Sequence, residues 1–235
     1  MSASVGVLLQ SDVVEAVTRD AAPPVVLTSK PNLWKPDDFA REQIRGLVRR
    51  VFFSGEAQPV RHVVFCAAEP QIDITRICDR VARALAEETQ SQVALMGRSE
   101  ETEDVLPANA DSQELSSIKS AFNQLASNLW YVRRNGLSEC GNGFGTAIHW
   151  LCCLKQLRQE FEYVVIEGPA AGVSSEAALL GQMTDGLILV LGAHRTRKAT
   201  AQKIKQTLQG AQSRILGTVL SERRFPIPES IYNRL

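Results

Sequence analysis

The segment from residue 68 to residue 75 lies where a phosphate-binding turn is expected, but its side chains are of the wrong kind. It follows a short apolar run, HVVFCA, and leads into a helical pattern, and ligands of open parallel sheets bind at such junctions. A carboxylate about 5 Å from a phosphate charge, at an effective dielectric of about 20, is repelled by roughly 3 kcal/mol. The turn therefore disfavours phosphate. The two carboxylates within it are Glu69 and Asp73.

A glycine-rich stretch, GNGFGT at residues 141–146, is a second candidate for anion binding. It follows the apolar run LWYV and precedes a helical pattern that Thr146 can cap, which is the order of a phosphate-binding turn. A single glycine-rich turn has two interpretations. It is either a displaced nucleotide or phosphate site, or a plain flexible loop.

Histidine and cysteine side chains gather between residues 140 and 153. On a helix, His149 and Cys153 lie four residues apart on one face and can both contact a metal ion. Two ligands do not complete a structural site, and Cys140 lies outside the helix, so we predict no metal centre. We interpret the cysteines instead as part of a buried apolar stripe. The stripe comprises Ile148, Leu151, Cys152 and Leu154.

Three further groups have weaker chemical potential. Glu167 ends the apolar run YVVIE and can hold a metal through water, but a polar residue at a strand end needs no metal to explain it. His62 and His194 have no nucleophile arranged around them, so we assign them no chemistry. Three arginines are candidates for binding an anionic ligand, such as a signalling nucleotide or a sugar phosphate. They are Arg98, Arg195 and Arg197.

Short apolar runs alternate with amphipathic helical patterns through most of the chain, which predicts an α/β domain. Six strands separated by helices predict a mainly parallel central sheet covered by helices on both faces. Four prolines break residues 1–36, which we predict to be an irregular arm before a single domain over 37–235. The predicted strands are 62–67, 92–96, 129–132, 163–167, 186–192 and 214–220, and the predicted helices are 37–53, 72–88, 113–126, 146–161, 174–183 and 196–209.

The 235 residues carry 26 basic and 26 acidic side chains, and this zero net charge argues against nucleic-acid binding driven by bulk charge. Six acidic residues and no basic one lie between Arg98 and Lys119, whereas the region from His194 onward carries a local excess of seven positive charges. No apolar run approaches the length of a membrane span, and the five cysteines form no CxxC pair. We expect a cytoplasmic protein.

The frame of residues 62–96 and the segment from Glu160 to Leu220 resemble the MinD/ParA-like P-loop ATPases. The resemblance is strongest to the BY-kinases, the bacterial tyrosine autokinases of capsule and exopolysaccharide export. Residues 163–169, YVVIEGP, stand where that family has its Walker B strand. The spacing of Glu42 and Arg45 matches the start of the family's ExxRxxR assembly helix, although Val48 replaces the final arginine and Arg49 follows it.

The same resemblance implies that the catalytic positions are degenerate. The family's phosphate loop has three glycines and ends in GxGK[ST]. Its glycines fall on Glu69, Gln71 and Asp73 and its lysine on Ile74, and only Pro70 and the hydroxyl of Thr75 are kept. The segment that bears two aspartates in the family reads VALMGRS here, at residues 93–99, with Gly97 and Ser99 in place of the aspartates. Tyr232 alone stands where the family has a terminal tyrosine cluster. We assign no catalytic residue.

The expected function is that of a pseudo-enzyme with a P-loop NTPase-like fold, which acts as an interaction or regulatory partner in exopolysaccharide or capsule synthesis. The resemblance implies a membrane polysaccharide co-polymerase or a homologous active kinase as partner, with peripheral membrane location through that partner. We expect no cofactor. One alternative keeps ATP and Mg²⁺ in an altered phosphate loop, and the other is the anion binder. The predicted surface for self-assembly or mixed assembly is Glu42, Arg45, Arg49 and Arg50.

Overall fold

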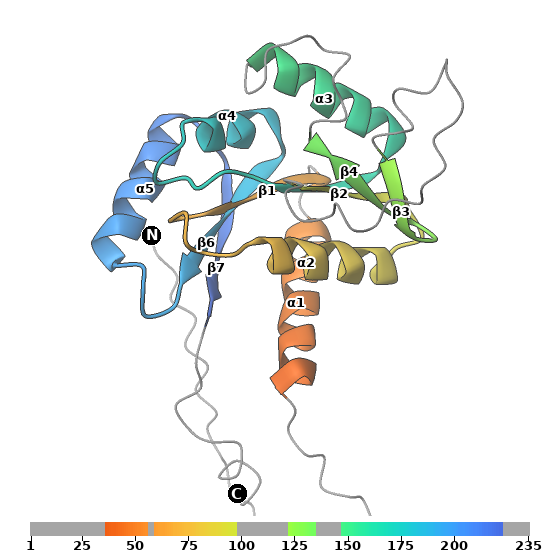
Figure 1. Cartoon of the computed structure of the whole chain (residues 1–235), viewed down its shortest axis with the longest axis horizontal. Coiled ribbons are helices and arrows are strands. Elements are labelled where there is room, and N and C mark those ends of the chain that lie inside the picture. The colour runs from red at the N-terminus through yellow and green to blue at the C-terminus, as the bar shows by residue number, and fades with distance from the viewer. Residues whose placement is uncertain (1–35, 56–58, 98–121, 135–146, 223–235) are drawn as a thin grey trace, which may run out of the picture. The chain divides into compact units, whose positions relative to one another are not determined.

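The structure, a computed structural model, describes residues 36–55, 59–97, 122–134 and 147–222. Within these ranges the chain forms a seven-stranded sheet with the order β3-β4-β2-β5-β1-β6-β7 (Figure 1). All neighbouring strands are parallel except β3 and β4. The strands are β1 (His62–Ala67), β2 (Val93–Gly97), β3 (Phe122–Ala126), β4 (Leu129–Arg133), β5 (Tyr163–Glu167), β6 (Gly186–Gly192) and β7 (Ile215–Ser221).

Helices cover both faces of this sheet, as the sequence predicts. Helices α1 and α2 lie on one side of the strands, whereas α3 and α4 lie on the other, with α5 beside α4 (Figure 1). Every residue of β1 and β2 is buried, which explains why these strands read as continuous apolar runs rather than alternating ones. The predicted fold class is confirmed. The helices are α1 (Pro36–Phe52), α2 (Thr75–Glu88), α3 (Ala147–Glu160), α4 (Glu176–Met183) and α5 (Lys198–Gly210).

The helix predicted over residues 113–126 is wrong at its carboxyl end, because Phe122–Ala126 forms the edge strand β3. Ala126 pairs with Leu129, so Ser127 and Asn128 make a two-residue hairpin turn. The Asn128 side-chain amide donates to the carbonyls of Ala86, Thr89 and Ser91, which fixes the turn against the end of α2. These tertiary contacts override the helical spacing of the sequence, and the sheet gains a seventh strand.

Three helices, α2, α4 and α5, begin two or three residues later than predicted. Just before α2 and α4, a polar side chain holds the chain in a turn. Asp73 Oδ1 accepts the amide proton of Thr75 at 3.0 Å, where α2 begins. Ser174 Oγ accepts the amide proton of Glu176 at 3.3 Å, where α4 begins. Helix α5 begins at Lys198, after the left-handed His194. The predicted arm lies outside the described residues except for Pro36, so its boundary stays a prediction.

Helix α1 is fixed to the domain by an apolar face and by ion pairs. Val48 is fully buried, and the ring of Phe52 meets Tyr163 of β5 edge-on, with 5.9 Å between ring centroids. Arginines of α1 also pair with acids of α2, as described below. The described helices include none that is both long and apolar enough to cross a membrane.

Candidate functional site

The turn between β1 and α2 is anchored in the hydrophobic core. Ile72 and Ile74 are only 4% and 5% exposed, whereas Gln71 and Asp73 between and beside them are exposed. The Ala68 amide donates to Val190 of β6 at 2.8 Å, and the Ile72 amide donates to the Glu69 carbonyl at 3.2 Å. Two isoleucines thus hold the predicted phosphate-loop positions against the body of the domain.

The backbone of this turn has no left-handed residue. Among the described residues, positive φ angles occur only at Gly55, His194, Gln212 and Glu222. A concave row of amides that holds an anion needs residues in this conformation, which glycine adopts readily. No acidic residue of the turn is therefore forced into left-handed geometry, and the family's glycines are not needed for the path that the chain takes through residues 68–74.

Asp73, Thr75, Tyr131 and Glu167 form a small polar group that we call the carboxyl-edge cluster. The Thr75 hydroxyl donates to Glu167 Oε1 at 2.8 Å, and Glu167 ends β5 next to Phe65 of β1. Thr75, at the start of α2, and Glu167, at the end of β5, therefore meet at the carboxyl ends of β1 and β5. The structure thus satisfies Glu167 with a hydroxyl proton.

Tyr131 is the member of the carboxyl-edge cluster that the sequence analysis missed. A Cβ atom added to Gly97 would lie 2.9 Å from the Tyr131 hydroxyl oxygen and 3.2 Å from Glu167 Oε2. The tyrosine thus fills the space beside position 97, where the resemblance places an aspartate. The only sequence signal was the apolar run LWYV, and it predicts a strand without telling which residue faces the site.

Of the three arginines of the predicted anion site, Arg195 and Arg197 lie in the described part of the chain. Arg195 Nη1 lies 3.3 Å from Glu222 Oε2, so a carboxylate already compensates its charge. Arg197 is exposed and precedes α5. Arg98 and the glycine-rich residues 141–146 lie outside the described residues. The anion site stays a prediction.

Two residues of the predicted assembly surface contact the neighbouring helix, and the other two are exposed. Arg45 and Arg49 pair with Glu87 and Glu88 of α2 at 3.2 and 2.9 Å, and the hydrogen bond and charge of Glu88 raise the pKa of Arg49. Glu42 and Arg50 are exposed and make no ion pair with the described residues. Two of the four residues thus bind α1 to its own domain.

The face of α3 that packs inward differs from the predicted apolar stripe. Ile148 and Leu151 are 70% and 55% exposed, and Cys152 is only partly buried. The buried side is set by Trp150, whose indole nitrogen donates to Glu176 of α4 at 2.6 Å. His149 Nε2 lies 3.5 Å from Cys153 Sγ, and no group of three metal-binding side chains occurs among the described residues. The buried residues are His149, Trp150, Cys153, Leu154 and Leu157.

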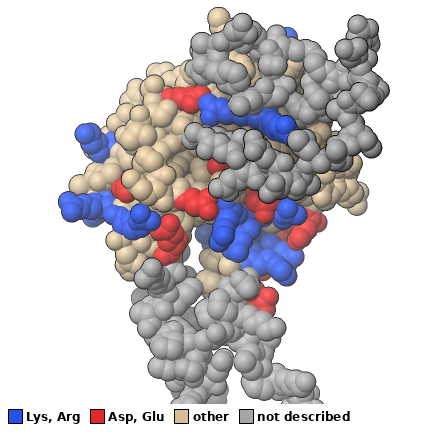
Figure 2. Space-filling view, in the orientation of Figure 1, with Lys and Arg blue, Asp and Glu red and all other residues tan. Residues whose placement is uncertain are grey.

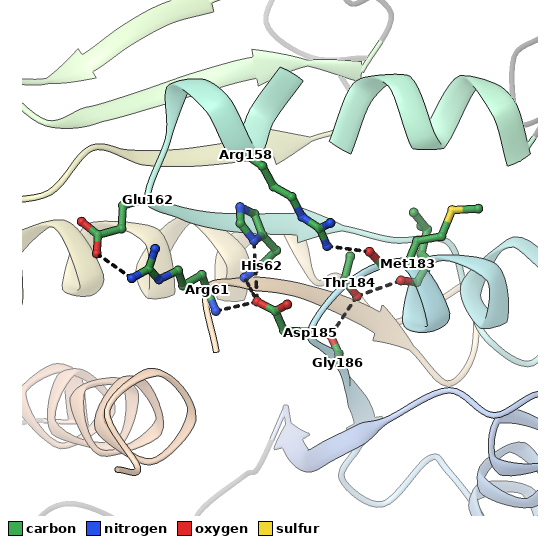
Figure 3. A network of polar contacts seen from close by, with 9 residues as sticks. Arg61, His62, Arg158, Glu162, Met183, Thr184, Asp185 and Gly186 are labelled. Atoms are coloured by element: carbon green, nitrogen blue, oxygen red, sulfur yellow. Dashed lines mark hydrogen bonds and ion pairs between the residues drawn. The ribbon is translucent and has the colours of Figure 1, made fainter. Parts of the chain in front are cut away.

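A second polar group lies at the opposite edge of the sheet, where β1, β5 and β6 begin (Figure 3). We call Arg61, His62, Glu162, Thr184 and Asp185 the amino-edge network. Asp185 Oδ2 accepts the amide protons of Arg61 and His62 at 2.7 and 2.8 Å, and His62 Nδ1 lies 3.6 Å away. Arg61 also lies 3.6 Å from Glu162.

The amino-edge network stabilises the negative charge of Asp185. Burial alone would raise the pKa of this carboxyl, but hydrogen bonds from the His62 side chain and from the His62 and Arg61 amides lower it to about 2. The neighbouring Thr184 hydroxyl donates to the Leu180 carbonyl at 2.7 Å, and Arg158 donates to the Met183 carbonyl at 2.9 Å (Figure 3). The network joins the end of α4 to the start of β1.

Comparison with known proteins supports the predicted resemblance. No model of a known protein family matches the chain. The tyrosine-protein kinase CpsD of Streptococcus pneumoniae serotype 4 is 30% identical over 95 residues, which cover 40% of this chain and 42% of that protein. The tyrosine-protein kinase YwqD of Bacillus subtilis is 28% identical over 76 residues, which cover 31% and 32%. The matched part thus spans less than half the length of these curated relatives.

Solved structures confirm the fold at lower identity. The chimeric protein CapA2B2 superposes with a TM-score of 0.61 at 18% identity, covering 82% of this chain and 86% of that one. The kinase domain of the Escherichia coli tyrosine kinase ETK also gives 0.61, at 16% identity and 80% and 79% coverage. MinD of Aquifex aeolicus gives 0.52, at 13% identity and 74% and 73% coverage. The chain has the MinD/ParA-like P-loop fold and is similar to the BY-kinases.

Proposed function

We propose that this chain is a catalytically degenerate relative of the BY-kinases, and that it acts as an interaction or regulatory partner in exopolysaccharide or capsule synthesis and export. The turn between β1 and α2 supports this most directly, because Ile72 and Ile74 are buried there and no residue is left-handed. Such a turn offers a triphosphate neither a concave row of amides nor an ammonium group.

The side chains around the turn also fit ATP and Mg²⁺ poorly. Asp73 and Glu167 both present negative charge, and the nearest cation along the chain is the exposed Arg76. Hydroxyl and carboxylate oxygens are ligands that Mg²⁺ accepts, but Thr75 and Glu167 bond to each other, and Mg²⁺ in nucleotide sites also relies on phosphate oxygens. A carboxylate side chain at position 97 would meet the Tyr131 hydroxyl and the Glu167 carboxylate. We therefore expect no nucleotide cofactor.

The proposed partners are a membrane polysaccharide co-polymerase, a homologous active kinase or further copies of this chain. In each case the protein works in the cytoplasm and reaches the membrane through its partner. Glu42 and Arg50 of α1 support a protein contact, because both are exposed and make no ion pair with the described residues. No nucleic acid is expected, since the chain has no net charge.

Titration of the purified chain with a fluorescent ATP analogue and Mg²⁺ tests the loss of nucleotide handling. We expect no saturable binding tighter than about 1 mM. Micromolar binding that is lost in Arg76→Ala would overturn the proposal in favour of an ATP-binding autokinase or ATPase with an altered loop. Thermal unfolding with nucleotide second messengers and sugar phosphates extends the test, because a ligand at a hundred times its Kd adds about 2.7 kcal/mol. A shift that disappears in Arg197→Glu would favour the anion binder.

The partner is tested by affinity capture from cytosol and solubilised membranes. We expect polysaccharide machinery to be recovered by the native chain and lost with Arg50→Glu, while the matched charge reversal Lys203→Glu on α5 retains it. Capture of unrelated metabolic enzymes alone would count against the proposed role.

A further inference from the structure

A groove of about 420 Å³ lies between α1 and α2, and arginines line it. Arg41 comes from α1, and Arg80 and Arg83 come from α2; all three are exposed. Ile44 and Ala84 provide an apolar floor between them. Figure 2 shows lysine and arginine side chains gathered over this part of the molecule, with acidic side chains around them. The groove therefore combines positive walls with an apolar base.

The positive charge of the groove is only partly compensated. Arg83 pairs with Asp79 at 2.9 Å, and Glu87 of the groove pairs with Arg45 at 3.2 Å. Arg41 and Arg80 pair with no carboxylate of the described residues. Two uncompensated guanidinium groups thus face one groove in a chain whose overall charge is zero. Guanidinium groups bind carboxylates through two parallel hydrogen bonds.

We propose that this groove docks an acidic segment of a partner protein, in which carboxylate side chains alternate with an apolar side chain. The dimensions fit such a peptide. From Arg80 to Glu87 the helix rises about 10 Å at about 1.5 Å per residue. An extended peptide covers this length in about three residues, with its first and third side chains on the same side. The apolar side chain between the two carboxylates points the opposite way, toward Ile44 and Ala84, and the long arginine side chains extend past it to the carboxylates.

The groove suits a mixed peptide better than a uniform polyanion. Glu87 lines the groove and Asp79 pairs with Arg83, so both repel the closely spaced phosphates of a nucleic acid or an anionic membrane, whereas a peptide with few carboxylates can place them at Arg41 and Arg80. The proposal relies on the proposed function only in assuming a protein partner, and it names the chemistry of that partner. It also places the contact beside, rather than on, the predicted surface of Glu42, Arg45, Arg49 and Arg50.

Fluorescence anisotropy with a labelled peptide, Gly-Glu-Leu-Glu-Leu-Glu-Gly, tests the groove in the full chain. The same peptide with glutamine in place of glutamate is the ligand control. We expect the glutamate peptide to bind at least tenfold more tightly than the glutamine peptide. The double variant Arg41→Glu, Arg80→Glu is expected to lose at least tenfold in affinity. The double variant Lys203→Glu, Lys205→Glu on α5 has the same change in net charge and is expected to change affinity less than twofold. Circular dichroism verifies that both variants fold.

Several results would overturn the proposal. Equal losses in the two double variants would mean that net charge, not the groove, attracts the peptide. Tight binding of phosphatidylserine vesicles that competes with the peptide would point to a membrane. A tenfold gain in peptide affinity when Glu100, Glu101, Glu103 and Asp104 are replaced by glutamine and asparagine would identify the chain's own acidic stretch as the occupant. ATP binding in the same samples would instead refute the proposed loss of nucleotide handling, and the proposal for the groove would stand.

Discussion

The two edges of the sheet carry polar groups of similar size that are held very differently. At the amino edge, Asp185 receives two backbone amides at 2.7 and 2.8 Å and lies beside a histidine that is only 6% exposed. At the carboxyl edge, the Thr75 hydroxyl makes one side-chain bond to Glu167, and Thr75 and Asp73 are exposed. The amino-edge network is thus built into the fold. The carboxyl-edge cluster lies where this fold usually does chemistry, and we expect it to contribute less to stability.

The largest expected effect comes from breaking the amino-edge network. Asp185→Ala removes the acceptor of two amide protons and the neighbour of His62, and hydrogen bonds to a charged group contribute about 1.5–3 kcal/mol each. We expect the free energy of unfolding, measured by urea denaturation, to fall by about 3 kcal/mol. Asp79→Ala removes an exposed pair within α2 and is expected to cost less than about 0.5 kcal/mol. Equal losses of unfolding free energy in Asp185→Ala and Asp79→Ala would mean that the amino-edge network stabilises the fold no more than an exposed ion pair does.

The pH dependence of stability sharpens the same comparison. The folded pKa of Asp185 is about 2, below the unfolded value of about 3.9, so its stabilising contribution is complete above both values. It is lost as pH falls from about 5 toward the folded pKa. Between pH 6 and pH 2.5, we expect the native chain to lose about 1.5 kcal/mol more than Asp185→Asn, after allowance for partial exposure. Identical pH profiles for the two proteins would show that Asp185 does not act through its charge.

The smallest effect is expected at the carboxyl edge. Thr75→Val removes the hydroxyl that donates to Glu167 while keeping a side chain of similar shape. Because Thr75 is exposed, water can replace the lost donor, and the free energy of unfolding should change by less than about 0.5 kcal/mol. A loss comparable with that of Asp185→Ala would mean that the two edges are built alike.

The sequence predicts the fold well because buried parallel strands leave a pattern that needs no tertiary information. The apolar runs of β1, β5 and β6 coincide with the strands within one residue. The pattern fails for Phe122–Ala126, whose spacing resembles a helix until Asn128 fixes a hairpin against α2. It also fails on α3, where an indole that bonds Glu176 decides which side faces inward.

The candidate site is harder to predict because it depends on register and packing. The altered phosphate-loop positions, Glu69 to Thr75, can be read directly from the sequence. That Ile72 and Ile74 are buried and that the turn avoids left-handed geometry requires the fold. Strands β2 and β4 pair with Leu95 opposite Tyr131, and this register brings the Tyr131 hydroxyl to position 97. The sequence of either strand alone does not predict the register.

The buried Ile74 also bears on whether such a turn can acquire the family's phosphate-loop residues during evolution. A lysine at this position alone would put an ammonium group into the core and destabilise the domain at once. The compensating phosphate contacts would appear only after glycines had replaced the residues at 69, 71 and 73 as well. The lysine substitution is therefore unfavourable until the others have occurred, which disfavours a gradual route to such a loop.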